Sequence, residues 1–144
     1  GRRVAEAGFD VAVFCAREWQ PSSTYYPGVQ VIHAPNEDDP YYPLSKVELQ
    51  TAVMTATRIE KLLAEDKKIL VTCMAGINRS GLVVALTLHK AIGYSGRACI
   101  ELVRARRQFH DVEALRNPQF VDVLMKLSGD EVIVLPGISP VVPP

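Results

Sequence analysis

Residues 68–88, KILVTCMAGINRSGLVVALTL, constrain the fold more than any other part of the sequence. An apolar run is followed by a short polar loop and then by a second apolar run, which predicts a buried strand, a tight loop and a helix. Backbone N–H groups converge where such a loop enters a helix, and the helix dipole adds positive potential. Gly76 lets the backbone bend at a point where a side chain would clash. The stretch therefore predicts an anion-binding loop.

Three side chains of this loop predict its chemistry. In a positive field Cys73 is expected as the nucleophilic thiolate, and Arg79 offers a planar fork that matches two phosphate oxygens. Ser80 is expected to cap the helix and to reach the Cys73 sulfur with its hydroxyl. The loop thus predicts transfer of a phosphoryl group to Cys73. Residues expected to cradle the phosphate are Met74, Ala75, Gly76, Ile77, Asn78 and Arg79.

These residues carry a family resemblance. TCMAGINRSG resembles the C-x-x-G-x-x-R-S signature of the cysteine-based protein tyrosine phosphatases, and residues 5–127 are similar to the dual-specificity branch. Thr72 is a departure, because that branch usually has His before the nucleophile, where it is thought to brace the loop by hydrogen bonds. A Thr hydroxyl supplies part of that bracing. The alternative is that Cys73 is a small core residue and Arg79 a surface residue.

The fold expected is α/β, with a mostly parallel central sheet flanked by helices and the site at the carboxyl end of the nucleophile strand. Apolar segments predict three strands, at residues 9–16, 29–34 and 68–73. Periodicity and capping residues predict helices at residues 2–7, 44–65, 80–91, 96–107 and 118–127. Gly93 is expected to end the third of these helices, and Asn117 and Pro118 are expected to open the last as N-cap and first residue. We expect one catalytic domain over residues 1–128, followed by a Pro-rich tail at 129–144 with a short extended piece at 132–135.

Composition narrows the setting. A chain of 144 residues that is 48% hydrophobic has the size and content of one globular domain. Its formal net charge of zero provides no global field toward nucleic acid or anionic membrane. Three cysteines in separate contexts do not form a disulfide framework, and no apolar run spans a membrane, so we expect a cytoplasmic protein. No residue cluster has metal-ligand spacing, so neither a metal nor a cofactor is expected.

The acidic loop at residues 35–43, PNEDDPYYP, is the candidate source of a general acid, because the leaving oxygen needs a proton. Asp38 and Asp39 are the two candidates. The resemblance favours Asp38, which falls on the family's general-acid position. Tyr41 and Tyr42 are either rim residues of the site or exposed loop residues.

The helices expected at 44–65 and 96–107 carry further predictions. Ser45 and Glu48 predict a capping box at the start of the helix at 44–65. Its imperfect apolar stripe is expected to pack on the sheet, and the members of this stripe are Val47, Met54, Ile59, Leu62 and Leu63. In the helix at 96–107, the family-like run of Arg104, Arg106 and Arg107 either adds positive potential near the site or forms a solvated basic face.

Cys15 lies at the end of the first clear strand. In a lipid phosphatase of the superfamily, a cysteine at the matching strand end pairs with the nucleophile on oxidation, so the resemblance implies Cys15 as a redox partner of Cys73. The alternative is a buried cysteine that packs as a small hydrophobic residue. Cys99 is expected in the core.

The substrate class rests on the resemblance and the loop. None of the loop residues from Met74 to Asn78 is basic, unlike the phosphoinositide-specific relatives. The leading prediction is a phosphoprotein phosphatase that acts on phosphotyrosine, with phosphoserine and phosphothreonine left open. GINRSG also resembles the G-F-N-R-T-G of RNA 5′-triphosphatases, although zero net charge argues against tight RNA binding. A phosphate-binding pseudophosphatase is the third alternative. The oligomeric state is left open.

Overall fold

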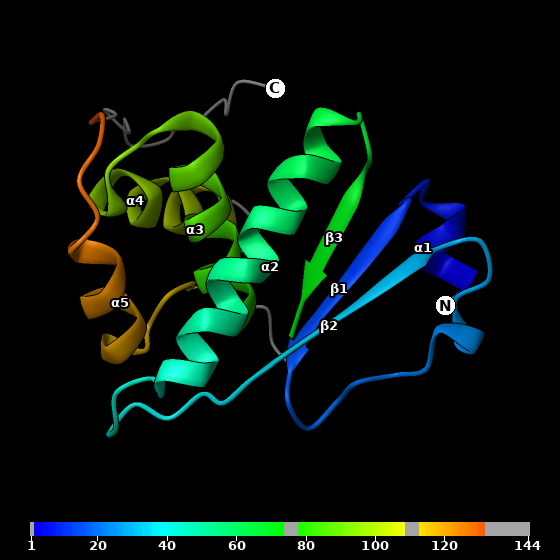
Figure 1. Ribbon diagram of the computed structural model, residues 1–144, viewed down its shortest axis with the longest axis horizontal. Coiled ribbons are helices and arrows are strands. Elements are labelled where there is room, and N and C mark those ends of the chain that lie inside the picture. Colours follow the sequence, from blue (N-terminus) through cyan, green and yellow to red (C-terminus); the bar gives the residue numbers. More distant parts are fainter. Residues whose placement is uncertain (1, 74–77, 109–112, 132–144) are drawn as a thin grey trace.

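Three parallel strands form the centre of the computed structural model, which describes residues 2–73, 78–108 and 113–131. The strands are β1 (Val11–Ala16), β2 (Gln30–Asn36) and β3 (Ile69–Thr72), in the spatial order β2-β1-β3 (Figure 1). Their pairing places Phe14 of β1 opposite His33 of β2 and Thr72 of β3. Every residue of β1 is buried, as expected for the middle strand of a parallel sheet that is covered on both faces. The expected parallel sheet is confirmed.

The helices begin and end close to the residues that their capping patterns predict. They are α1 (Arg2–Glu6), α2 (Lys46–Ala64), α3 (Arg79–Ile92), α4 (Gly96–Gln108) and α5 (Pro118–Met125), with one 3₁₀ turn, η1 (Ser23–Tyr25). Ser45 and Glu48 form the predicted capping box of α2. Gly93 ends α3 in the left-handed conformation, with a φ of 84°. Asn117 caps α5, whose first residue is Pro118.

The two faces of the sheet are covered unequally. Helices α2 to α5 gather on one side, while α1 and η1 lie on the other (Figure 1). The larger core cluster joins Val11, Val13 and Cys15 of β1 to apolar residues of these helices. On the opposite face, Phe14 packs with Tyr26 in a smaller cluster beneath α1. Most of the apolar burial that stabilises the domain is therefore on the helical side.

The apolar stripe predicted for α2 is partly wrong. Val47 and Met54 are each 71% exposed, and Leu63 is 46% exposed. The buried face is instead built from small and branched side chains, namely Ala52, Thr55, Ala56, Ile59 and Leu62. Ala52, Thr55 and Ala56 are small, so the helix can approach its neighbours closely at positions that a search for large apolar residues passes over.

The last described residues remain attached to the helical side. Asp130 pairs with Tyr94 in an isolated parallel bridge, through 2.8 Å hydrogen bonds with the backbone of Gly93 and Ser95. The extended piece predicted at 132–135 lies outside the described residues. Among the described residues, no helix has both the length and the apolar composition needed to cross a membrane.

Candidate active site

The predicted site residues gather at the carboxyl edge of the sheet. Cys73 directly follows β3, Asp38 lies two residues beyond β2, and Glu18 lies two residues beyond β1. Because the strands are parallel, these three positions share one edge, where open α/β sheets usually bind ligands.

Cys73 and Ser80 are in direct contact. The Cys73 sulfur lies 3.3 Å from the Ser80 hydroxyl oxygen, and the two residues are only 7% and 5% exposed. Ser80 is not the N-cap that the sequence predicts, because α3 already begins at Arg79. Its hydroxyl is therefore free to face the sulfur. Thr72 donates from its hydroxyl to the Cys73 carbonyl oxygen at 3.2 Å, in the place of the usual His. The expected cradle residues Met74, Ala75, Gly76 and Ile77 lie outside the described residues.

Arg79 is held by a carboxylate that the sequence did not single out. Its Nη1 and Nη2 atoms donate to the two carboxylate oxygens of Glu18 at 2.5 and 2.6 Å, and Nη1 also donates to the Asn36 carbonyl at 3.3 Å. The side chain of Arg79 is 9% exposed, whereas that of Glu18 is 51% exposed. The Glu18 hydrogen bonds raise the pKa of Arg79, with further contributions from the charges of Glu18, Cys73 and Asp38.

The contacts of Arg79 leave one edge of its guanidinium for a ligand. A guanidinium has five N–H donors, and three of them go to Glu18 and Asn36. The Nε atom is buried and has no hydrogen-bond partner among the described residues. The Nε–H and the remaining Nη2–H lie side by side on the same edge of the planar group, so they form a two-donor fork of the kind that binds two phosphate oxygens.

Asp38 and Asp39 have different surroundings. Asp38 accepts hydrogen bonds from the side-chain amide of Asn78, at 3.1 and 2.9 Å to its two oxygens, and from that of Asn117 at 2.9 Å. Asp39 instead accepts from the backbone N–H of Tyr41 at 2.9 Å, as a turn residue does. The placement of the two carboxylates favours Asp38. Tyr41 and Tyr42 are 84% and 71% exposed.

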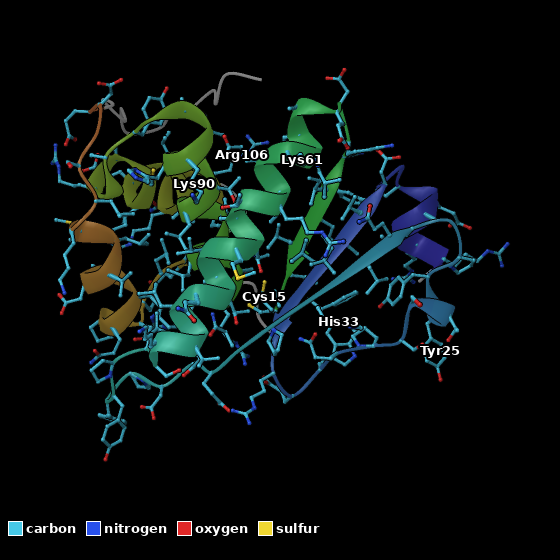
Figure 2. All side chains as sticks on the ribbon, in the orientation of Figure 1. Cys15, Tyr25, His33, Lys61, Lys90 and Arg106 are labelled. Atoms are coloured by element: carbon cyan, nitrogen blue, oxygen red, sulfur yellow. The ribbon has the colours of Figure 1, made fainter. Side chains whose placement is uncertain are left out.

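Phe14 of β1 and Thr72 of β3 are paired across the ladder between the two strands. Cys15 comes one residue after Phe14, and Cys73 comes one residue after Thr72. The two cysteines thus occupy matching positions at the same end of neighbouring strands, and Figure 2 labels Cys15 there. Both side chains are buried, and among the described residues neither forms a disulfide. Burial raises the pKa of Cys15 to about 12, and the charge of Cys73 acts in the same direction. Cys15 is therefore a neutral thiol at the position beside Cys73.

In the basic run, the exposed side chain of Arg104 also contributes to the fold. It donates to the backbone carbonyls of Ala114 and Leu115, at 3.3 and 2.7 Å. The part of the chain that the structure describes holds no group of three or more His, Cys, Asp or Glu side chains able to bind a metal ion.

Sequence reasoning missed Glu18 and the second contact of Asn117. A signal for Glu18 existed, because a buried Arg requires an acidic partner and Glu18 follows the end of a neighbouring strand. The Asn117 contact with Asp38 had no sequence signal, since its role as an N-cap already explained the Asn-Pro pair.

Comparison with known proteins agrees with this geometry. Residues 2–129 match the family described as dual specificity phosphatase, catalytic domain. No curated protein sequence matches the chain significantly. Among solved structures, human DUSP28 is 27% identical, with a TM-score of 0.69 over 87% of this chain and 78% of that one. A mouse putative dual specificity phosphatase, complexed with zinc tungstate, is 27% identical, with a TM-score of 0.70 over 87% and 72%.

A third solved structure, Tk-PTP in the active form, is 29% identical, with a TM-score of 0.71 over 88% of this chain and 84% of that one. The family match over residues 2–129 spans the three strands and the helices α1 to α5. The chain belongs to the dual specificity phosphatase catalytic domain family and has the fold of a cysteine-based phosphatase.

Proposed function

We propose that this protein hydrolyses phosphotyrosine in phosphorylated proteins through a phosphocysteine intermediate. The observation that supports it best is the pairing of a buried cysteine, 3.3 Å from a hydroxyl, with an Arg whose remaining donor edge is unoccupied among the described residues. A nucleophile and a phosphate clamp are thus adjacent in sequence and in space.

In the first step the Cys73 sulfur attacks phosphorus, and an S–P bond forms as the P–O bond to the leaving oxygen breaks. Arg79 holds two of the non-bridging oxygens through its free edge, which stabilises the charge of the transition state. Asp38 gives its proton to the leaving phenoxide. The products of this step are the dephosphorylated tyrosine and phosphocysteine.

In the second step water attacks the phosphocysteine while the Asp38 carboxylate takes its proton. The S–P bond breaks and the electron pair returns to the Cys73 sulfur. The Ser80 hydroxyl, already in contact with that sulfur, donates a hydrogen bond to the departing thiolate. Phosphate is released and Asp38 is again protonated, so the cycle closes.

The substrate class follows from the loop and the charge of the chain. Residues 74–78 are Met, Ala, Gly, Ile and Asn, so no Lys or Arg there is available for further phosphates of an inositol ring. The formal net charge of zero gives no broad attraction to RNA. A singly phosphorylated side chain of a protein is the substrate that these features favour.

The test compares phosphate release from a phosphotyrosine peptide and from a 5′-triphosphate RNA, each with the wild type and with Cys73→Ser. We expect release from the peptide, and its loss in Cys73→Ser, which keeps the size of the side chain but lacks a thiolate. Release mainly from RNA would overturn the substrate class and retain the chemistry. Binding of the peptide without any release would identify a pseudophosphatase.

A further inference from the structure

We propose that Asn78 and Asn117 are positioning residues that hold Asp38 for proton transfer. The inference rests on the proposed function and extends it from the reacting groups to the residues behind them. Asp38 is an exposed side chain, which would sample several rotamers if nothing held it. Both of its carboxylate oxygens instead accept N–H groups from the two amides.

The orientation of the Asn78 amide is fixed from behind. Its oxygen accepts two successive backbone N–H groups, from Arg116 at 2.7 Å and from Asn117 at 2.9 Å. Since N–H groups demand an acceptor, the amide must turn its oxygen toward them and its nitrogen toward Asp38. Asn78 immediately precedes Arg79, so the same residue connects the general acid to the phosphate clamp.

The orientation of the Asn117 amide is fixed by a helix. Its oxygen accepts the backbone N–H of Gln119 at 2.9 Å as the N-cap of α5, which leaves its nitrogen for Asp38. Asn117 is 2% exposed, so its amide has little freedom to turn away. Gln119 adds a second tie to the same loop, because its side chain donates to the Pro40 carbonyl at 3.2 Å.

A strained turn supports both amides. Leu115 has a φ of 55°, a left-handed conformation that a branched residue adopts only when its surroundings impose it. Its side chain is fully buried against Gly81 of α3, and Arg104 binds its carbonyl oxygen. This turn aims the N–H groups of Arg116 and Asn117 at one oxygen. Strain next to a candidate acid fits a role in positioning it.

The test uses Asn117→Ser, because Ser also caps helices but is too short to donate to Asp38. Steady-state rates are measured on phenyl phosphate, whose leaving group needs a proton, and on 4-nitrophenyl phosphate, whose leaving group needs it far less. We expect kcat on phenyl phosphate to fall about 10-fold with KM within about 2-fold, and the loss on 4-nitrophenyl phosphate to be smaller. Asn117→Asp, which also keeps the cap but replaces the donor by a second carboxylate, should lose more.

The decisive control is the same substitution in an Asp38→Ala background. If Asn117 positions Asp38, Asn117→Ser should not lower kcat further once Asp38 has been replaced. If its role is purely structural, the substitution should lower kcat by the same factor in the wild-type and the Asp38→Ala backgrounds. Equal losses, or an Asn117→Ser enzyme as fast as the wild type on phenyl phosphate, would overturn the inference while leaving the proposed function intact. A wild type without turnover, or full activity in Cys73→Ser, would overturn the proposed function and this inference with it.

Discussion

At the scale of single residues, Arg79 has to satisfy the fold and a substrate at the same time. A buried guanidinium needs a fixed counter-charge, and Glu18 supplies it through the Nη1–Nη2 edge. A phosphate group would use the other edge, where Nε has no partner among the described residues. The two anions therefore occupy different sides of one planar group. Glu18 orients the clamp and does not block it.

The matching positions of Cys15 and Cys73 predict a reversible disulfide. Peroxide should oxidise the Cys73 thiolate to a sulfenic acid; the Cys15 sulfur then attacks that sulfur, an S–S bond forms and water leaves. Because burial raises the pKa of Cys15 to about 12, the attack should accelerate as the pH rises. Peptide mapping after mild peroxide, without reductant, should show the cross-link at neutral pH and more of it at alkaline pH.

Two variants control this experiment. Cys15→Ser should lack the cross-link and lose activity irreversibly under peroxide. Cys99→Ser removes another buried cysteine and should keep the cross-link. Maps that contain no Cys15–Cys73 peptide at any pH would leave Cys15 as a packing residue only.

At the scale of elements, α4 and α5 meet at a point where only a glycine fits. A Cβ atom at Gly96, the first residue of α4, would lie 1.6 Å from the Leu124 carbonyl oxygen and 3.3 Å from the Cβ of Leu127. The backbone N–H of Gly96 also donates to the Leu127 carbonyl at 2.9 Å. The end of α5 is therefore held directly on the backbone of α4, and α5 in turn begins at Asn117.

Gly96→Ala should consequently force the two helices apart. We expect a loss of at least ~2 kcal/mol in the free energy of unfolding and a Tm lower by roughly 5–10 °C. Gly28→Ala is the matched control: its added Cβ meets no atom within 4 Å, although the φ of 78° still disfavours a side chain. Thermal unfolding of both variants separates the steric clash from the backbone conformation. A Gly96→Ala variant with the Tm of the wild type would refute the close contact.

The elements that were predictable are those with a local signal. The strands, the Ser45 and Asn117 caps and the Gly93 terminus follow from patterns within a few residues. The buried face of α2 was only partly predicted, because large apolar residues were taken as buried: Ile59 and Leu62 are buried as expected, whereas the rest of that face consists of Ala52, Thr55 and Ala56. Within the site, Cys73, Ser80 and Arg79 share one motif. Glu18 and the amides around Asp38 come together only through tertiary contacts, which no local spacing encodes.

At the scale of the whole molecule, the site depends on three strands ending at one edge. Glu18 follows β1, Asp38 follows β2 and Cys73 follows β3. Arg79, at the start of α3, binds Glu18. The pair of Glu18 and Arg79 thus ties the loop after β1 to the start of α3, across 61 residues of sequence. A contact of this range stabilises the packing of α3 on the sheet as well as the site.

Stability of the domain should therefore depend on pH through Glu18. Hydrogen bonding to Arg79 lowers the pKa of Glu18 from 4.5 to about 2. A depressed folded-state pKa means that the stabilisation is present above about pH 4.5 and is lost as the pH falls toward 2. Denaturant unfolding should give Glu18→Gln a lower free energy of unfolding than the wild type at about pH 6. The difference between the two proteins should be smaller at about pH 3.

The matched control is Glu37→Gln, which removes the same charge from an ion pair with Arg17 in which both side chains are more than half exposed. An exposed pair contributes little, so this variant should stay close to the wild type at both pH values and be insensitive to salt. Glu18 is itself 51% exposed, so part of its effect should be screened by salt, while the part owed to the buried Arg79 persists. If the difference in free energy of unfolding between Glu18→Gln and the wild type is the same at the two pH values, the carboxylate charge does not stabilise the fold.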